Sequence, residues 1–369
     1  MGSWLILIKT DDPHAKYGDN KLHLGKKLYS LLLMKNFGFI LIVFCLSFIS
    51  CSTNDPSPVP VEPEVVLEDA YNYLVLRHDG QMFEIGDKTG KIKTINKIPN
   101  IDLLNMNSVT TSSTKLYFYE HKFPPLQPVI YEYDFQTKSS RSHNIVFSEL
   151  EFGPFAGLET MEWDAGRKGF IAIVRANYGE NRPDPGRLAF INAETFKVSS
   201  LNIDVPQKYI MGTLIRGNEI FASSYRSNSS EYVSDFFKIN LQTGLMTNIE
   251  VDGMTIAPIH LSQNPGKNTL FGFLPVHGSS YMGASKPVVF DPETGIVKQL
   301  FPNEVIGNYN RSGRSFFNSQ NKEHVDLITS PDYLALFRYN SDTQEVVITK
   351  LPHPNDLGTE NTIVAAVKL

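Results

Sequence analysis

Basic and aromatic side chains recur about every 50 residues, each time near the end of an apolar run typical of a β-strand. Arginine and histidine can hold an anion through charge-assisted hydrogen bonds, and arginine can form two in parallel. Nine residues at or near these strand ends form the candidate ligand-binding set: Arg77, His78, His121, Arg175, Arg182, Tyr225, Arg226, His277 and Arg314. Alternatively, these side chains satisfy backbone carbonyls of their own loops.

Some of the same residues suit proton transfer. His277 with Tyr225 or Tyr281 could remove and return protons, while Arg226 neutralises a substrate carboxylate. This set would make a polysaccharide lyase acting on glycans that contain uronic acids. Outside this hypothesis the sequence predicts no catalytic residue, no cofactor and no metal ligand, since it has no nucleophile elbow, metal motif or complete phosphate loop.

One short phrase recurs six times and organises the chain. It consists of an alternating apolar run, Asp or Asn, two residues, Thr, and often Gly. Its threonines are Thr89, Thr137, Thr195, Thr243, Thr294 and Thr343. Asp or Asn closes a turn through its side chain and Gly accepts a positive φ, so the phrase predicts a hairpin. The first copy differs, with Gly86 three residues before Thr89 where the others carry Asp or Asn.

Two further strand-like runs precede the hairpin in most copies. Four short strands per roughly 50 residues, repeated, indicate an all-β fold, a six-bladed β-propeller. The first copy lacks one strand, and the C-terminal run 362–368 is spare. We therefore expect the C-terminal strand to pair into the first blade and close the ring, which removes open sheet edges.

In this order of strands, the loops between the second and third strands lie on the face opposite the recurring turns. These loops are long in blades two to five and short in blades one and six. Functional residues concentrate on such loops, so this face is the predicted binding face.

The N-terminal residues precede the fold. An apolar run over residues 37–49 follows Met34 and Lys35, and Ser50 and Cys51 come directly after it. The run is short for a membrane span and fits the core of a signal peptide. A signal anchor over residues 28–49 is the alternative. The second cysteine, Cys45, lies inside the run, and the 318 residues after Cys51 contain none, which excludes a disulfide framework there.

Phe48-Ile49-Ser50-Cys51 resembles a bacterial lipobox, in which the cysteine becomes the lipidated N-terminus. A bulky residue at Phe48 is typical of lipoproteins of the Bacteroidetes type. Residues 1–33 then form a leader that is not native, 34–51 the lipoprotein signal peptide, 52–70 a Pro-rich tether and 71–369 the propeller. On this interpretation Met34 is the native start.

The net charge of the chain argues against one class of partner. The whole chain has a net charge of −5; residues 1–51 carry six Lys and three Asp, so the remainder has 28 basic and 36 acidic residues and a net charge of −8. Nucleic acid is therefore not an expected partner.

The lipobox, tether and repeats together resemble envelope lipoproteins of Bacteroidetes that carry propellers. The resemblance implies a lipid anchor at Cys51 in the cell envelope, on the outer membrane. It also implies binding of an acidic glycan, a ferric siderophore or a partner protein, in support of an outer-membrane transporter. A lyase is the alternative, because the fold by itself assigns neither role.

Overall fold

The structure is a computed structural model. It describes residues 67–103, 106–122, 127–177, 185–225, 234–251, 257–276, 284–300, 306–308, 314–330, 333–357 and 361–369. All of these belong to one compact unit, Val66–Leu369. Among the described residues no helix is long and apolar enough to span a membrane. The predicted leader, signal peptide and Cys51 lie outside the described residues.

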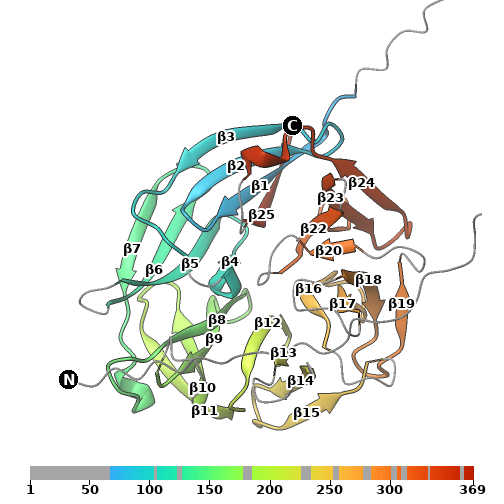
Figure 1. Ribbon diagram of the computed structural model, residues 1–369. Coiled ribbons are helices and arrows are strands. Elements are labelled where there is room, and N and C mark those ends of the chain that lie inside the picture. Colours follow the sequence, from blue (N-terminus) through green and yellow to red (C-terminus); the bar gives the residue numbers. More distant parts are fainter. Residues whose placement is uncertain are drawn as a thin grey trace, which may run out of the picture. The chain divides into compact units, whose positions relative to one another are not determined.

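The chain folds into six blades of four antiparallel strands arranged in a ring (Figure 1), which confirms the predicted propeller. From the innermost strand outwards, the first three blades are β25 (Asn361–Lys368), β1 (Tyr71–Arg77), β2 (Gln81–Gly86) and β3 (Ile92–Lys97); β4 (Val109–Thr111), β5 (Lys115–Lys122), β6 (Gln127–Asp134) and β7 (Ser140–Asn144); and β8 (Gly157–Asp164), β9 (Gly169–Arg175), β10 (Gly186–Asn192) and β11 (Val198–Val205).

The other three blades follow the same order. They are β12 (Tyr209–Arg216), β13 (Glu219–Tyr225), β14 (Ser234–Asn240) and β15 (Met246–Ile249); β16 (Ile259–Gln263), β17 (Leu270–Pro275), β18 (Ala284–Phe290) and β19 (Val297–Gln299); and β21 (Phe316–Asn318), β22 (Glu323–Ser330), β23 (Tyr333–Asn340) and β24 (Val346–Lys350). The inner strands contact one another in the order β25, β4, β8, β12, β16, β21 and back to β25, which defines the axis.

The C-terminal strand closes the ring as predicted. β25 pairs with β1 along its length, from Tyr71 opposite Lys368 to Arg77 opposite Asn361. The first blade is therefore built from both ends of the domain, and its inner strand is the last one in the sequence.

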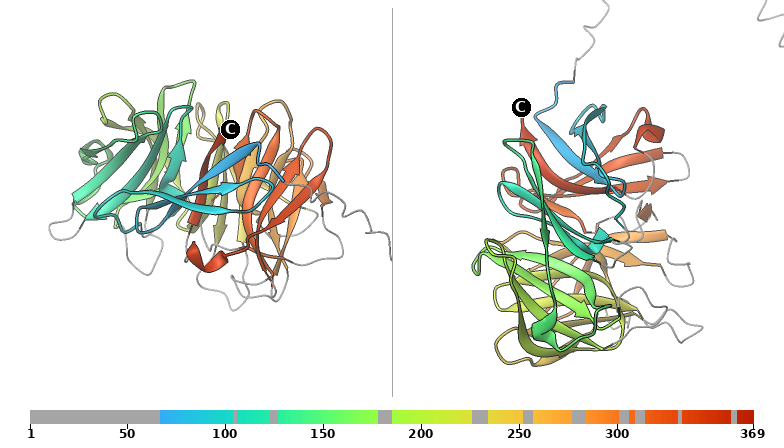
Figure 2. Two further views of the ribbon diagram at one scale, coloured as in Figure 1. Left: turned by 90° about the horizontal axis from the view of Figure 1, so that it is seen from above. Right: turned by 90° about the vertical axis from the view of Figure 1, so that its left-hand side faces the viewer.

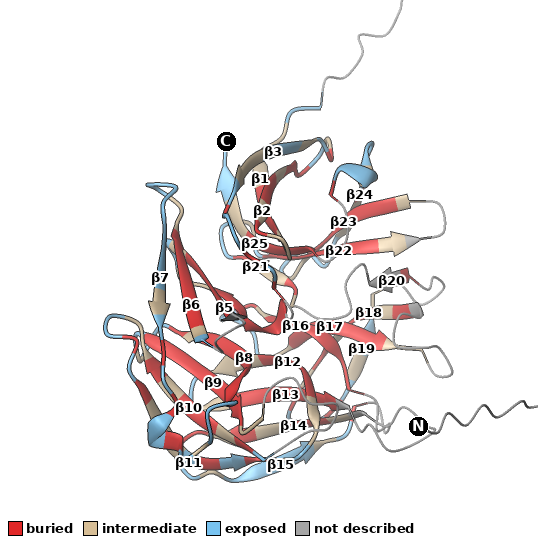
Figure 3. Ribbon diagram, turned by 60° about the vertical axis from the view of Figure 1, so that its left-hand side comes forward, coloured by how far each residue is buried: buried red, intermediate tan, exposed pale blue. Residues whose placement is uncertain are grey.

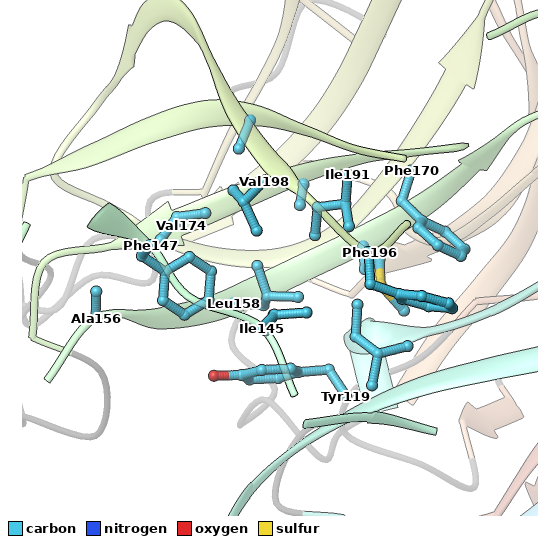
Figure 4. Packing of buried hydrophobic residues seen from close by; sticks show 14 of the residues in the cluster. Tyr119, Ile145, Phe147, Ala156, Leu158, Phe170, Val174, Ile191, Phe196 and Val198 are labelled. Atoms are coloured by element: carbon cyan, nitrogen blue, oxygen red, sulfur yellow. The ribbon is translucent and has the colours of Figure 1, made fainter. Parts of the chain in front are cut away.

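Each blade buries both of its faces against its neighbours. The hydrophobic core consists of six clusters, one at each junction between blades. Figure 4 shows the cluster between the second and third blades, where Tyr119 and Ile145 face Leu158 and Phe170. Because alternate side chains of a middle strand enter different junctions, these strands are apolar at successive positions. The outer strands β7, β15 and β19 are largely exposed (Figure 3).

The recurring phrase forms the hairpin between the third and fourth strands. In five blades the Asx side-chain oxygen accepts a bond from the backbone N–H two residues on, at 2.9–3.0 Å. The residue after Thr has φ between 55° and 71° in all six turns: Gly90, Lys138, Phe196, Gly244, Gly295 and Gln344. This left-handed conformation explains the frequent Gly, and the other three blades adopt it without Gly.

The first blade completes its turn with a residue from outside the phrase. Asp69 Oδ1 accepts bonds from the N–H groups of Lys88 and Thr89, each at 2.8 Å, and Thr89 Oγ1 donates to Asp69 Oδ2 at 2.6 Å. Asp69 thus takes the place of the Asx side chain that Gly86 lacks. A Cβ at Gly86 would lie 2.1 Å from Asp69 Oδ2, so Gly86 is required while Asp69 is present. The last residues assigned to the tether therefore contact the first blade.

Blades five and six are joined by an extra strand that the repeat pattern did not predict. β20 (Ile306–Asn308) lies in the connection between these blades and pairs with both β18 and β22. It makes one continuous sheet of two blades. Each of the other blades forms a separate sheet.

We predict that Asp69→Ala lowers the free energy of unfolding by about 2 kcal/mol, because three bonds to an ionised carboxylate are lost. Burial opposes ionisation of Asp69, but the bonds from Thr89 and Lys88 outweigh it, so its pKa lies below the usual value. The stabilisation is therefore present above the ordinary Asp pKa of about 4 and disappears as the pH falls through the lower, folded-state pKa. Urea unfolding at pH 7 and pH 3 measures both effects.

The double variant Asp69→Ala, Gly86→Asp should regain part of the loss, since it restores the turn of the other blades. Gly86→Asp alone should destabilise the domain, because its side chain meets Asp69. Glu68→Ala, at an exposed neighbour, is the control. Equal stability of Asp69→Ala and the wild type would contradict this role.

Candidate functional site

The two faces of the ring differ in their connections. Figure 2 shows the ring edge-on. The strand order places the six recurring turns on one face and the connections between second and third strands on the other. We call the second one the loop face; it carries the connections between second and third strands. These connections span residues 176–185, 226–233 and 276–283 in blades three to five, and only 78–80 and 331–332 in blades one and six. The prediction of a long connection in blade two was wrong, because β5 and β6 extend to Lys122 and Gln127 and leave only residues 123–126 between them.

Arg77 and His78 lie at the end of β1 on the loop face. The Arg77 guanidinium donates to both oxygens of Asp79, at 2.7 and 2.9 Å, and to the carbonyl of Leu357 at 3.2 Å. These bonds hold the pKa of Asp79 well below its usual value. His78 Nδ1 lies 3.5 Å from Asp102 Oδ1. Arg77 therefore joins the first blade to the connection that follows the sixth.

Arg175 is buried, with 4% of its surface exposed. Its Nε donates to Glu159 Oε2 at 2.6 Å, and its other nitrogens donate to the carbonyls of Pro206 at 2.9 Å and Lys208 at 2.5 Å. Burial raises the pKa of Glu159 in spite of the nearby guanidinium. Arg175 thus binds backbone carbonyls of the connection between blades three and four. This agrees with the alternative that the basic residues at strand ends satisfy backbone carbonyls.

Arg314 reaches across the axis. It precedes β21 in blade six, and its guanidinium pairs with Glu162 of β8 in blade three, the opposite blade. Thr213 Oγ1 of blade four also donates to Glu162, at 3.0 Å. Burial raises the pKa of Glu162 in spite of Arg314. These three residues link three inner segments of the ring.

The side chains of the other predicted site residues are not described by the structure. Arg182, Arg226, His277 and Tyr281 lie outside the described residues, and so does the sequence 278–283 with the outline of a phosphate loop. His121 and Tyr225 are the strand-end residues of β5 and β13, but their side chains are not described. Of the nine candidates, four have described side chains, and all three arginines among them are paired with carboxylates of the chain.

Sequence reasoning did not find a polar group at the junction of blades five and six. His260 Nδ1 of β16 lies 2.8 Å from Asp326 Oδ2 of β22, and Ser315 Oγ donates to the same oxygen at 2.6 Å. All three residues are nine-tenths or more buried. The available signal was Asp326, which interrupts the apolar run of β22. Ser315 directly follows Arg314, so the contacts of His260 and Asp326 lie next to the pair of Arg314 and Glu162.

A second buried histidine lies at the same junction. His324 stacks against Phe271, with ring centres 5.0 Å apart, and its Nδ1 lies 2.8 Å from Ser262 Oγ. Burial lowers the pKa of His324 to about 3. It is therefore neutral at pH 7. Within the described ranges, no three His, Cys, Asp or Glu residues lie together as a potential metal site.

Known proteins resemble this chain only in their fold. No family model matches the chain, and no curated protein matches its sequence. Among solved structures, the chain is similar to TolB from Acinetobacter baumannii, with a TM-score of 0.51 and 12% sequence identity. The similarity covers 80% of this chain and 65% of the TolB chain, so this chain spans less than two thirds of the length of TolB. It is also similar to a chain of a nidogen/laminin complex, with a TM-score of 0.49 and 11% identity over 80% and 98% of the two chains. At such identities the likeness concerns the fold alone.

We predict that Arg314→Met destabilises the domain by about 3–5 kcal/mol, because it leaves the buried Glu162 carboxylate without its counter-charge. The double variant Arg314→Met, Glu162→Gln should be markedly more stable than Arg314→Met. Chemical unfolding of all variants measures the coupling between the two residues. Lys197→Met, which breaks an exposed pair with Glu149, should cost less than about 1 kcal/mol. Purely additive effects at Arg314 and Glu162 would refute the coupling.

Proposed function

We propose that this protein is a lipid-anchored binding propeller of the cell envelope, and that it binds an anionic ligand through the loop face. The difference between the two faces carries the proposal. Six copies of one turn occupy one face, whereas the other face carries the longer connections 176–185, 226–233 and 276–283 of blades three to five, which differ in sequence. A rigid scaffold with variable loops on one face is a common arrangement for binding.

The loop residues, rather than the arginines at the strand ends, are the proposed ligand contacts. Arg77, Arg175 and Arg314 already bind carboxylates of the chain, so an anion would have to compete with these bonds. Arg182, Arg226 and His277 belong to the connections of three successive blades. The proposed ligand is an acidic glycan or a ferric siderophore, which the protein would pass to an outer-membrane transporter.

We predict that a ligand of one of these classes raises the melting temperature of the chain without its predicted leader and signal peptide (residues 52–369), since the ligand binds the folded state only. The probes are oligosaccharides of galacturonic acid and a ferric catecholate complex. The variant Arg182→Ala, Arg226→Ala should lose the shift while its melting temperature without ligand is unchanged. Lys88→Ala, Lys91→Ala removes two exposed charges on the opposite face and should keep it.

Two outcomes would overturn the proposed function. One is a chain that no probe stabilises. The other is an unsaturated product, detected by new ultraviolet absorbance, when the chain is incubated with uronic-acid polymers. That product would identify the lyase of the alternative hypothesis, with His277, Tyr225, Tyr281 and Arg226 as its candidate residues.

The proposed anchor is a lipid on Cys51, joined to the ring by the Pro-rich tether. The sequence of the lipobox supports it, and so does the start of the fold at Asp69, which leaves a tether of about 17 residues. In extended form such a tether spans about 50 Å.

We predict that Cys51→Ala moves the protein from the membrane fraction to the soluble fraction of cells that process lipoproteins. Cys45→Ala, inside the apolar run, should leave it in the membrane fraction. Immunoblots of the two fractions measure this. Retention of Cys51→Ala in membranes would favour the signal anchor instead.

A further inference from the structure

The chain enters the ring on the face that carries the six recurring turns, which we call the turn face. Asp69 binds the N–H groups of Lys88 and Thr89 in the turn of the first blade. β1 starts beside the end of β25 (Figure 1), where the N–H of Leu369 bonds the carbonyl of Ala70 at 3.1 Å. The segment that precedes the ring, residues 52–66, is therefore joined to it on the side opposite the loop face.

Exposed aliphatic side chains are concentrated on the turn face. Among the described residues, eight large hydrophobic side chains are exposed. The two on the loop face, Val146 and Phe155, lie in the connection between blades two and three. Exposed apolar residues are normal when they are scattered, but a concentration on one face favours an interaction surface. The six on the turn face are Leu67, Leu245, Met246, Ile296, Val367 and Leu369.

These six side chains form two groups in different parts of the ring. Leu67, Val367 and Leu369 belong to the first blade, at the place where the chain enters. Leu245 and the two others follow the recurring turns of blades four and five. A partner that covers both groups must lie across the whole turn face, so an extended flat surface fits them better than a small ligand does.

Exposed lysines accompany the aliphatic side chains. The turn face carries eight exposed lysines but only five exposed aspartates and glutamates, although the chain after residue 51 has a net charge of −8. Lys88, Lys91 and Lys368 lie in the first blade, around the point of entry. Lysine is depleted where two proteins meet. Lysines combined with exposed aliphatic side chains are instead typical of a surface that lies on anionic lipid.

We propose that the turn face lies on an anionic membrane surface, with its aliphatic side chains among the lipid headgroups and its lysines beside the phosphates. The loop face then points away from the membrane, towards the ligand. This inference rests on the proposed function, because the lipid on Cys51 brings the ring to the membrane. The contact is weak by itself, and a tether of about 50 Å strengthens it by keeping the face near the lipid. Without the lipid, as in Cys51→Ala, the contact does not hold the chain in the membrane fraction.

The test replaces the lipid by an independent tether. Residues 52–369, which contain the whole compact unit, carry an N-terminal histidine tag that binds a nickel-chelating lipid in vesicles of brominated phosphatidylcholine, with or without phosphatidylglycerol. This chain has no cysteine, so a fluorophore can be attached to single-cysteine variants. Gln136→Cys and Gln242→Cys place it on the turn face, and Asn355→Cys places it on the loop face, each at an exposed position. Bromine on the acyl chains quenches the fluorophore only at short range.

The expected result is quenching of both turn-face labels on vesicles with phosphatidylglycerol, and none of the loop-face label. The quenching should decrease in high salt, because salt screens the lysines. Lys88→Gln, Lys91→Gln should lower the equilibrium constant for contact by more than about tenfold. The matched control is Lys97→Gln, Lys350→Gln, at the loop-face ends of β3 and β24, and it should leave the constant unchanged.

Two results would overturn the inference. One is quenching of the label in Asn355→Cys, and the other is the absence of quenching at all three positions. Neither result affects the melting shift with ligand or the release of Cys51→Ala, so the proposed function would stand. If instead no probe stabilises the chain, or Cys51→Ala stays in membranes, the proposed function fails. The nickel tether still decides then whether the turn face contacts anionic lipid.

Discussion

The pairing of the last strand with the first one is the constraint on which the rest of the structure depends. Every blade is apolar on both faces, so no blade can be left with an uncovered side. The first blade meets this requirement only when β25 from the C-terminus lies beside β1. Closing the ring therefore orders both ends of the domain and supplies the sixth junction at the same time.

Polar contacts reinforce the closure where the first and sixth blades meet. Asp87, 3% exposed, accepts bonds from the N–H groups of Ala70 and Tyr71 and lies 3.5 Å from Arg338 of blade six. The N–H of Leu369 bonds the carbonyl of Ala70. Asp69, the residue before, completes the turn of the first blade. The start of the fold, its end and the irregular first turn thus share one corner of the molecule.

Ionisable groups near the axis also join blades to one another. Residues of the inner strands in blades three, four and five, together with the segment before β21, make buried bonds between blades. Most of these groups are fully bonded, and their role is to join blades. His260, held with a φ of 53°, joins blades five and six through its contact with Asp326, 2.8 Å away.

The sequence by itself determined the number of blades, the turns and the closing strand. These features depend on local patterns: the Asx oxygen, the residue with positive φ and the alternation of apolar residues act within a few positions of the chain. Only the tertiary structure decided what each charged residue does. Arg175 ends β9 and Arg314 precedes β21; Arg175 binds Glu159 of its own blade and the connection to blade four, whereas Arg314 crosses the axis to Glu162. The partners of Asp69, His260 and Arg314 lie 20, 66 and 152 residues away in the sequence, and only the tertiary structure brings them together.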